Sequence, residues 1–96
     1  MDELDKKELY ENIKDSAVIQ FSAAWCAPCK VMTKNIESMS DNLNAIFFKV
    51  YVDKYPELSS EFSIKALPTL ISFKDGKESG RLIGVRTKEQ ILEFVK

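Results

Sequence analysis

The chain carries, at residues 25–30, the run Trp25-Cys26-Ala27-Pro28-Cys29-Lys30. This short run holds both cysteines and the only tryptophan of the protein. Two thiols separated by two residues can close into a small disulfide ring and open again. The spacing therefore indicates dithiol–disulfide chemistry, provided that a strand precedes the run and a helix follows it.

The length, composition and net charge of the chain limit the kinds of protein and of partner that it fits. Its 96 residues are 45% hydrophobic and 30% charged, which predicts one soluble globular domain over residues 1–96. The 14 basic and 15 acidic residues leave a net charge of −1, so we expect no nucleic-acid partner and no membrane partner. The residues after Met1 include no apolar stretch of the secretory type, which favours a cytoplasmic protein, and we expect a monomer.

Histidine is absent from the chain. Its absence excludes a Cys-His or Ser-His-Asp hydrolase and any zinc site that uses imidazole. Two cysteines cannot fill a four-ligand metal site, although a dimer that shares four thiolates would provide one. We therefore expect no metal and no cofactor beyond a redox-active Cys26–Cys29 disulfide, with the metal-sharing dimer as an alternative.

Hydrophobic patterns predict the elements around the cysteine run. Apolar residues at helical spacing predict a surface helix over about residues 2–14. The nearly continuous apolar segment 17–23 predicts a strand that is buried on both faces. Pro28 is compatible with the first turn of a helix, and apolar residues at helical spacing extend that helix to about Met39.

Shorter elements are expected in the middle of the chain. Ser40-Asp41-Asn42 is typical of a turn. Ile46–Val52 is rich in aromatic and β-branched residues and predicts a central strand. A short helix is expected over Pro56–Phe62, because two apolar residues lie four positions apart in it.

The last third of the chain predicts a hairpin and a helix. Thr69–Lys74 and Lys77–Val85 flank Asp75-Gly76, which is a strong hairpin signal. Thr87–Gln90 forms a capping box that opens the final helix. A βαβ half followed by an antiparallel hairpin predicts a mixed sheet with helices on both sides.

These motifs together resemble the thioredoxin family over essentially the whole chain. The cysteine run, the Leu67-Pro68-Thr69 turn, the hairpin at 73–77 and the Gly84 loop occur in the family's order and spacing. The resemblance implies the thioredoxin fold of the α/β class, with three α/β/α layers and four helices around a mixed sheet. Because the chain begins late relative to the family, the first family strand is expected to be absent, which leaves a four-stranded sheet.

The sequence departs from the family pattern at several positions. Ala27 replaces the usual glycine between the cysteines, and Gln20 replaces the buried acidic residue six positions before the first cysteine. Ser22 stands where an aromatic residue is common, and Lys34 replaces the proline that kinks the active-site helix. The changes at Gln20, Ala27 and Ser22 keep a non-enzymatic binding module open as an alternative.

The resemblance assigns different roles to the two cysteines. Cys26, at a helix N-terminus that favours the thiolate, is expected to attack a target disulfide. Cys29, one helical turn further and expected to be buried, then resolves the mixed disulfide. Pro28 and Ala27 are expected to influence how oxidising the pair is. An idle or zinc-binding cysteine pair is the alternative interpretation.

A docking surface is expected beside the nucleophile. Trp25 is expected to form part of it, with a core role as the alternative. By resemblance, Pro68 is expected to follow a cis peptide bond, leaving the backbone of Leu67 free to pair with an extended substrate. Three residues of the following loop would complete the apolar patch: Ile83, Gly84 and Val85. A plain core role remains open for the two aliphatic residues of that loop.

Gln20 raises a question about the resolving step. An amide cannot accept a proton at neutral pH, so the proton of Cys29 is expected to pass to water or to the departing thiolate. This would slow resolution relative to ordinary family members. Lys49 matches the family lysine near the buried acid; without that partner it either tunes the site or serves as a strand residue that reaches solvent.

These observations predict a thiol–disulfide oxidoreductase that reduces disulfide-containing target proteins. The resemblance alone implies its electron donor, thioredoxin reductase, an NADPH-dependent flavoprotein. A disulfide oxidant or isomerase with the same fold is one alternative; the missing signal segment and the missing histidine between the cysteines argue against it. A second alternative is a binding module that docks one partner through Trp25 and Pro68.

Overall fold

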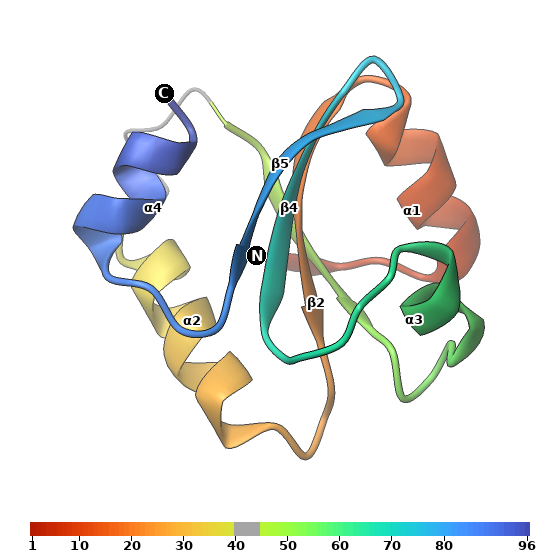
Figure 1. The fold of residues 1–96 in the computed structure, drawn as a ribbon, viewed down its shortest axis with the longest axis horizontal. Helices are drawn as coiled ribbons and strands as arrows, with labels where there is room; N and C mark the ends of the chain where they lie inside the picture. The colour runs from red at the N-terminus through yellow and green to blue at the C-terminus, as the bar shows by residue number, and fades with distance from the viewer. Residues whose placement is uncertain (40–44) are drawn as a thin grey trace.

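The computed structural model describes residues 1–39 and 45–96, so the turn expected at Ser40-Asp41-Asn42 lies outside the described residues. The elements follow one another as β1 (Asp2–Glu3), α1 (Lys6–Ile13), β2 (Ser16–Ser22), α2 (Ala27–Glu37), β3 (Phe47–Tyr51), α3 (Glu57–Glu61), β4 (Thr69–Lys74), β5 (Lys77–Ile83) and α4 (Lys88–Phe94). The strand–helix context that the cysteine run requires is confirmed, because β2 precedes it and α2 begins within it (Figure 1). None of the described helices has both the length and the apolar character needed to cross a bilayer.

The sheet is mixed, as the sequence predicts. Its strands lie in the order β1-β3-β2-β4-β5. β3 runs parallel to both β1 and β2, whereas β4 is antiparallel to β2 and to β5. The hairpin of β4 and β5 turns at Asp75 and Gly76, both of which have positive φ.

The expectation of four strands is wrong, because β1 adds a fifth strand at the edge of the sheet. Its two residues pair with β3 through the main chain, and both of their side chains are exposed. A strand this short and this exposed has no apolar signature in the sequence. The helix expected from residue 2 accordingly begins only at Lys6, where the carboxylate of Asp5 accepts a hydrogen bond from the main-chain N–H of Glu8 at 2.8 Å.

Helices cover both faces of the sheet (Figure 1). α1 and α3 lie on one face, where Leu9 and Leu58 join one buried apolar cluster. α2 and α4 lie on the other face, where Met32 and Ile91 join a second cluster. The three-layer α/β/α arrangement is therefore confirmed.

β2 supplies both clusters because successive side chains of a strand point to opposite faces. Ile19 and Phe21 belong to the cluster under α1 and α3, whereas Val18 belongs to the cluster under α2 and α4. Gln20 has the same parity as Val18. The strand therefore directs this amide toward the face covered by α2, which begins at the cysteines.

Thr87 starts α4 with the capping box that the sequence predicts. Its Oγ1 accepts a hydrogen bond from Gln90 N at 3.1 Å, and Gln90 Oε1 accepts one from Thr87 N at 2.9 Å. We expect Thr87→Ala to lower the free energy of unfolding by about 1 kcal/mol, because a helix N–H loses its acceptor. Urea unfolding would measure the change. Thr87→Ser is the control that keeps the hydroxyl, and an equal loss in both variants would argue against the cap.

Candidate active site

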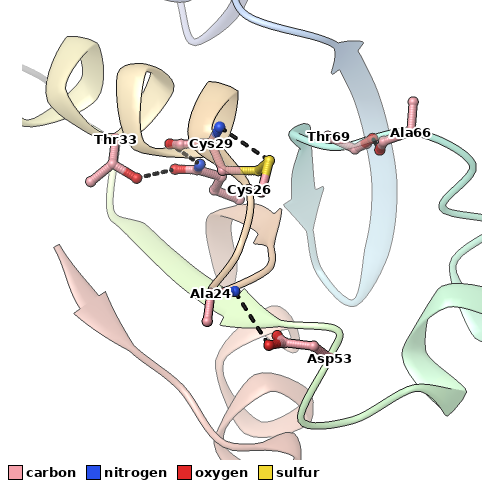
Figure 2. The surroundings of a disulfide bond; sticks show 8 residues. Ala24, Cys26, Cys29, Thr33, Asp53, Ala66 and Thr69 are labelled. Atoms are coloured by element: carbon pink, nitrogen blue, oxygen red, sulfur yellow. Dashed lines mark hydrogen bonds between the residues drawn. A yellow bond between two sulfur atoms is a disulfide. The ribbon is translucent and has the colours of Figure 1, made fainter.

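Cys26 and Cys29 form a disulfide at the N-terminus of α2, with their Cα atoms 5.3 Å apart. Cys26 is the residue that precedes the first helical turn, and its Sγ accepts a hydrogen bond from Cys29 N at 3.2 Å (Figure 2). Pro28 lies in that first turn, where its missing N–H costs the helix nothing. Both cysteines are buried: Cys26 is 4% exposed and Cys29 is fully covered.

The loop between β2 and α2 is fixed at two points. Cys26 N donates to Ala23 O at 3.1 Å. Ala24 N donates to a carboxylate oxygen of Asp53 at 3.3 Å (Figure 2). Asp53 follows β3, so a distant part of the chain holds the loop that presents the cysteines. No local sequence pattern indicated this contact, because Asp53 lies 29 residues after Ala24.

Gln20 lies fully buried directly behind the cysteines. Its Nε2 donates to the main-chain oxygen of Cys29 at 3.0 Å, and its Oε1 accepts a hydrogen bond from Thr33 Oγ1 at 3.1 Å (Figure 2). The amide therefore has a partner at each end, and no described buried side-chain polar atom lacks a hydrogen-bond partner. Thr33 was missed by the sequence analysis, although it lies four residues after Cys29 and thus on the same helix face.

Lys49 pairs with Gln20 in the register of β3 and β2. It is half-buried and lines a cavity of about 310 Å³ that also reaches Cys29 and Thr33. The charge of Lys49 acts on the carboxylate of Glu37. The pKa of Glu37 is lowered mainly by a hydrogen bond from the amino group of Met1 and more weakly by Lys49. Lys49 therefore lies near the site, beside the cavity behind Cys29.

The Leu67–Pro68 peptide bond is cis, which confirms the expectation for Pro68. Pro68 itself is buried, and Leu67 is half-buried and packs against the cluster that holds both cysteines. Gly84 N donates to Pro68 O at 2.8 Å, and Gly84 has φ +86°, a conformation that favours glycine. The loop after β5 is thereby joined to the cis-proline turn.

An open groove of about 650 Å³ lies next to the disulfide. Its walls include Trp25, Cys26, Ala27, Pro28 and Leu67. Cys29 does not line this groove, so the two sulfurs differ in what they face.

Trp25, which lines the groove, and two residues beside Gly84 in the loop joined to the cis-proline turn are exposed apolar side chains. Trp25 is 74% exposed, and Ile83 and Val85 are 52% and 43% exposed. The core roles left open for these three side chains are therefore wrong. Exposed apolar side chains that lie close together are typical of surfaces that contact other molecules.

A buried strand, a dithiol at the following helix N-terminus and an opposing cis-proline turn define a thiol–disulfide exchange protein. Within residues 1–39 and 45–96, no three or more Cys, Asp or Glu side chains gather in a way that would hold a metal ion. The redox-active group that the structure shows at this site is the Cys26–Cys29 disulfide.

Comparison with known proteins agrees with this class. The thioredoxin family model matches residues 2–96. A thioredoxin of Chlamydia trachomatis is 36% identical over 91 residues, which cover 88% of this chain and 89% of the relative. A thioredoxin of Mycoplasmoides gallisepticum is 40% identical over 80 residues, covering 82% of this chain and 80% of the relative. The crystal structure of thioredoxin NaTrxh from Nicotiana alata superposes with a TM-score of 0.86 at 28% identity, covering 98% of this chain and 88% of that one.

The chain belongs to the thioredoxin family. Its Cys-x-x-Cys pair, closed as a disulfide at the helix N-terminus, makes it a thiol–disulfide oxidoreductase of the protein-disulfide reductase type. The binding-module and oxidant alternatives are not favoured.

Proposed function

We propose that the protein, acting as one domain, reduces disulfides of target proteins through two successive exchanges at Cys26 and Cys29. The Cys26 thiolate attacks one sulfur of the target disulfide; a mixed disulfide forms and the other target sulfur leaves as a thiolate. The Cys29 thiolate then attacks Cys26 Sγ, which forms the Cys26–Cys29 disulfide and releases the second target thiolate. Two electrons pass to the target, and its two thiolates take up two protons from the solvent.

The observation that carries this assignment is the asymmetry of the two sulfurs. Cys26 lines the open groove, whereas Cys29 is fully buried and lies outside that groove. A target can therefore approach Cys26 but not Cys29. The free N–H groups at the start of α2 favour a thiolate at Cys26, and the N–H of Cys29 already points at its sulfur.

The proton of Cys29 would leave without help from a buried acid. Gln20 occupies the place behind Cys29, and both ends of its amide are engaged by main chain and hydroxyl groups. The cavity beside Cys29, Thr33 and Lys49 is large enough for water, which would take the proton. We propose that Lys49 acts there by favouring the thiolate of Cys29 through its charge.

Target docking would use the groove and the loops beside it. The main chain of Leu67 would pair with an extended target segment, as an added strand does. Trp25 and three residues of the neighbouring loop would cover the target's apolar side chains: Ile83, Gly84 and Val85. Ala27 and Pro28, which line the same groove, would set the spacing and stiffness of the dithiol.

An electron donor is needed to regenerate the dithiol after each turnover. We propose thioredoxin reductase, the NADPH-dependent flavoprotein that serves this family, as that donor. We also propose that the protein works as a monomer in the cytoplasm, where the glutathione and thioredoxin systems keep most thiols reduced.

NADPH consumption in the presence of a thioredoxin reductase and a disulfide-containing model protein tests this proposal. We expect oxidation of NADPH that requires all three components and yields free target thiols in a ratio of two per NADPH. Direct reduction of the protein by dithiothreitol, in place of the reductase, separates a mismatched reductase from an inactive dithiol. A chemically reduced protein that transfers no electrons to the target would contradict the proposal.

A further inference from the structure

Acidic residues are absent from the three segments that surround the disulfide. Residues 24–36, 62–70 and 82–88 contain no aspartate and no glutamate, although the whole chain has 15. The same three segments carry five basic residues: Lys30, Lys34, Lys65, Arg86 and Lys88. Acidic residues instead gather elsewhere, for example in residues 2–15, where six of them lie.

The fold brings three of these basic side chains close to the disulfide. Lys65 lines the groove together with Trp25 and Cys26. Lys30, Lys34 and Lys49 line the neighbouring cavity that reaches Cys29, and one acidic residue, Glu37, lines it as well. Cations thus lie on both sides of the disulfide.

Arg86 is held at the edge of the docking loop. Its Nε and one terminal nitrogen donate to Ile83 O at 3.2 and 3.1 Å, and Asn35 Nδ2 donates to Arg86 O at 2.9 Å. These bonds fix the guanidinium beside Ile83, one of the exposed apolar residues. Its charge is satisfied by a carbonyl group and not by a carboxylate.

The cations of this face lack carboxylate partners in the described part of the chain. Lys30, Lys34, Lys65 and Arg86 form no ion pair with any carboxylate of residues 1–39 or 45–96. Elsewhere, Lys6, Lys54, Arg81 and Lys96 are each paired with a glutamate. Within residues 1–39 and 45–96, the one carboxylate that forms a hydrogen bond with the loop between β2 and α2 is that of Asp53, which accepts from Ala24 N.

We propose that the active-site face selects target segments that carry acidic side chains next to the disulfide to be reduced. This inference rests on the proposed function and names the class of target that the same site prefers. The apolar centre would cover the target's disulfide region, and the surrounding cations would attract its carboxylates. The remainder of the chain carries more acidic than basic residues, so its net charge would not attract the same target.

The effect would act on encounter and not on the exchange chemistry. Unpaired surface cations raise the local concentration of an anionic partner, and such steering changes association rates by a factor of 10 or more. Salt removes it, because the screening length falls from about 10 Å at 0.1 M to about 3 Å at 1 M ionic strength. The selectivity should therefore appear in kcat/KM at low salt and disappear at high salt.

Two model peptides test the proposal. Both contain the same internal disulfide, flanked in one by glutamates and in the other by lysines. We expect the chemically reduced protein to reduce the glutamate peptide about tenfold faster at low ionic strength, and the two peptides at similar rates near 1 M salt. Equal rates at low salt, or a preference for the lysine peptide, would overturn the proposal.

Matched charge reversals locate the effect on the surface. Lys30→Glu/Lys65→Glu should abolish or invert the preference, whereas Lys74→Glu/Lys77→Glu, which makes the same charge change at the distant hairpin, should leave it in place. Lys74 and Lys77 face each other across β4 and β5, away from the cysteines. Loss of the preference in both double variants would overturn the assignment to the active-site face.

A binding measurement separates this proposal from the reductase function. The exposed Trp25 is the only tryptophan, so its fluorescence reports contact at the groove. Peptides with serine in place of both cysteines cannot undergo disulfide exchange, so they report binding alone. Quenching by the glutamate peptide and not by the lysine peptide would support the docking preference, even if the protein reduced neither disulfide peptide. Equal quenching by both peptides would overturn the proposal. It would also be overturned if an oligonucleotide, used as an unrelated polyanion, quenched the fluorescence while the two peptides did not differ.

Discussion

Cys29→Ser is expected to stop turnover and to leave the protein joined to its targets through Cys26. A serine hydroxyl is not ionised near neutral pH, so nothing attacks Cys26 Sγ after the mixed disulfide has formed. Turnover should fall on the order of 10³-fold or more, because the second exchange loses its nucleophile. Non-reducing electrophoresis and mass spectrometry of the trapped complex would measure the result.

Cys26→Ser is the matched control for this experiment. It should lose turnover equally but trap no target, because Cys29 is fully buried and does not line the groove. Accumulation of a mixed disulfide through Cys29 in this variant would reverse the roles of the two cysteines. Turnover that survives in either variant would contradict the two-step exchange.

Gln20→Asp is expected to speed the resolution of the mixed disulfide. The carboxylate would lie on the face of β2 that α2 covers, where the present amide is hydrogen-bonded to Cys29 O and Thr33 Oγ1. It would accept the proton of Cys29, and we expect a gain of about tenfold, below the roughly 10²–10⁴-fold that a well-placed general base contributes. Stopped-flow measurement of target release after formation of the mixed disulfide gives this rate directly.

Gln20→Asn is the control, since asparagine has the shape of aspartate but cannot accept a proton. The rate gain should be confined to the aspartate variant and should follow the ionisation of its carboxyl group. Equal resolution rates in the two variants would show that a base at this position contributes nothing to the step.

The same pair of variants should differ in stability with pH. Burial raises the pKa of a carboxyl group in the folded state above the value of about 3.9 that it has in the unfolded chain. The protonated form is then favoured by folding, so Gln20→Asp should match Gln20→Asn below about pH 3.9. Its free energy of unfolding should then decline relative to Gln20→Asn as the pH rises through the raised pKa. Urea unfolding at several pH values would detect the divergence.

Local signals predicted most of the fold. The apolar run at residues 17–23, the capping box at Thr87–Gln90 and the Asp75-Gly76 turn each act over a few residues, and each produced the expected element. β1 escaped prediction because only its main chain takes part in the sheet, as an edge partner of β3. The choice between core and surface for Trp25 also needed the structure, since its exposure depends on segments far along the chain.

The sequence by itself determined the reactive pair. Cys26, Pro28 and Cys29 are close neighbours, and a strand before them with a helix after them suffices to place both sulfurs at a helix N-terminus. The sequence also determined that no carboxylate stands at position 20.

The tertiary structure alone decided what surrounds that pair. The contacts of Gln20 with Thr33, of Ala24 with Asp53 and of Gly84 with Pro68 join residues 13 to 29 positions apart. The approach of Lys30, Lys34 and Lys65 to the disulfide likewise depends on segments that are far apart in the sequence. The physical reason is that the order and register of the strands determine which distant residues become neighbours. The hydrogen bonds between strands join segments that are far apart in the sequence.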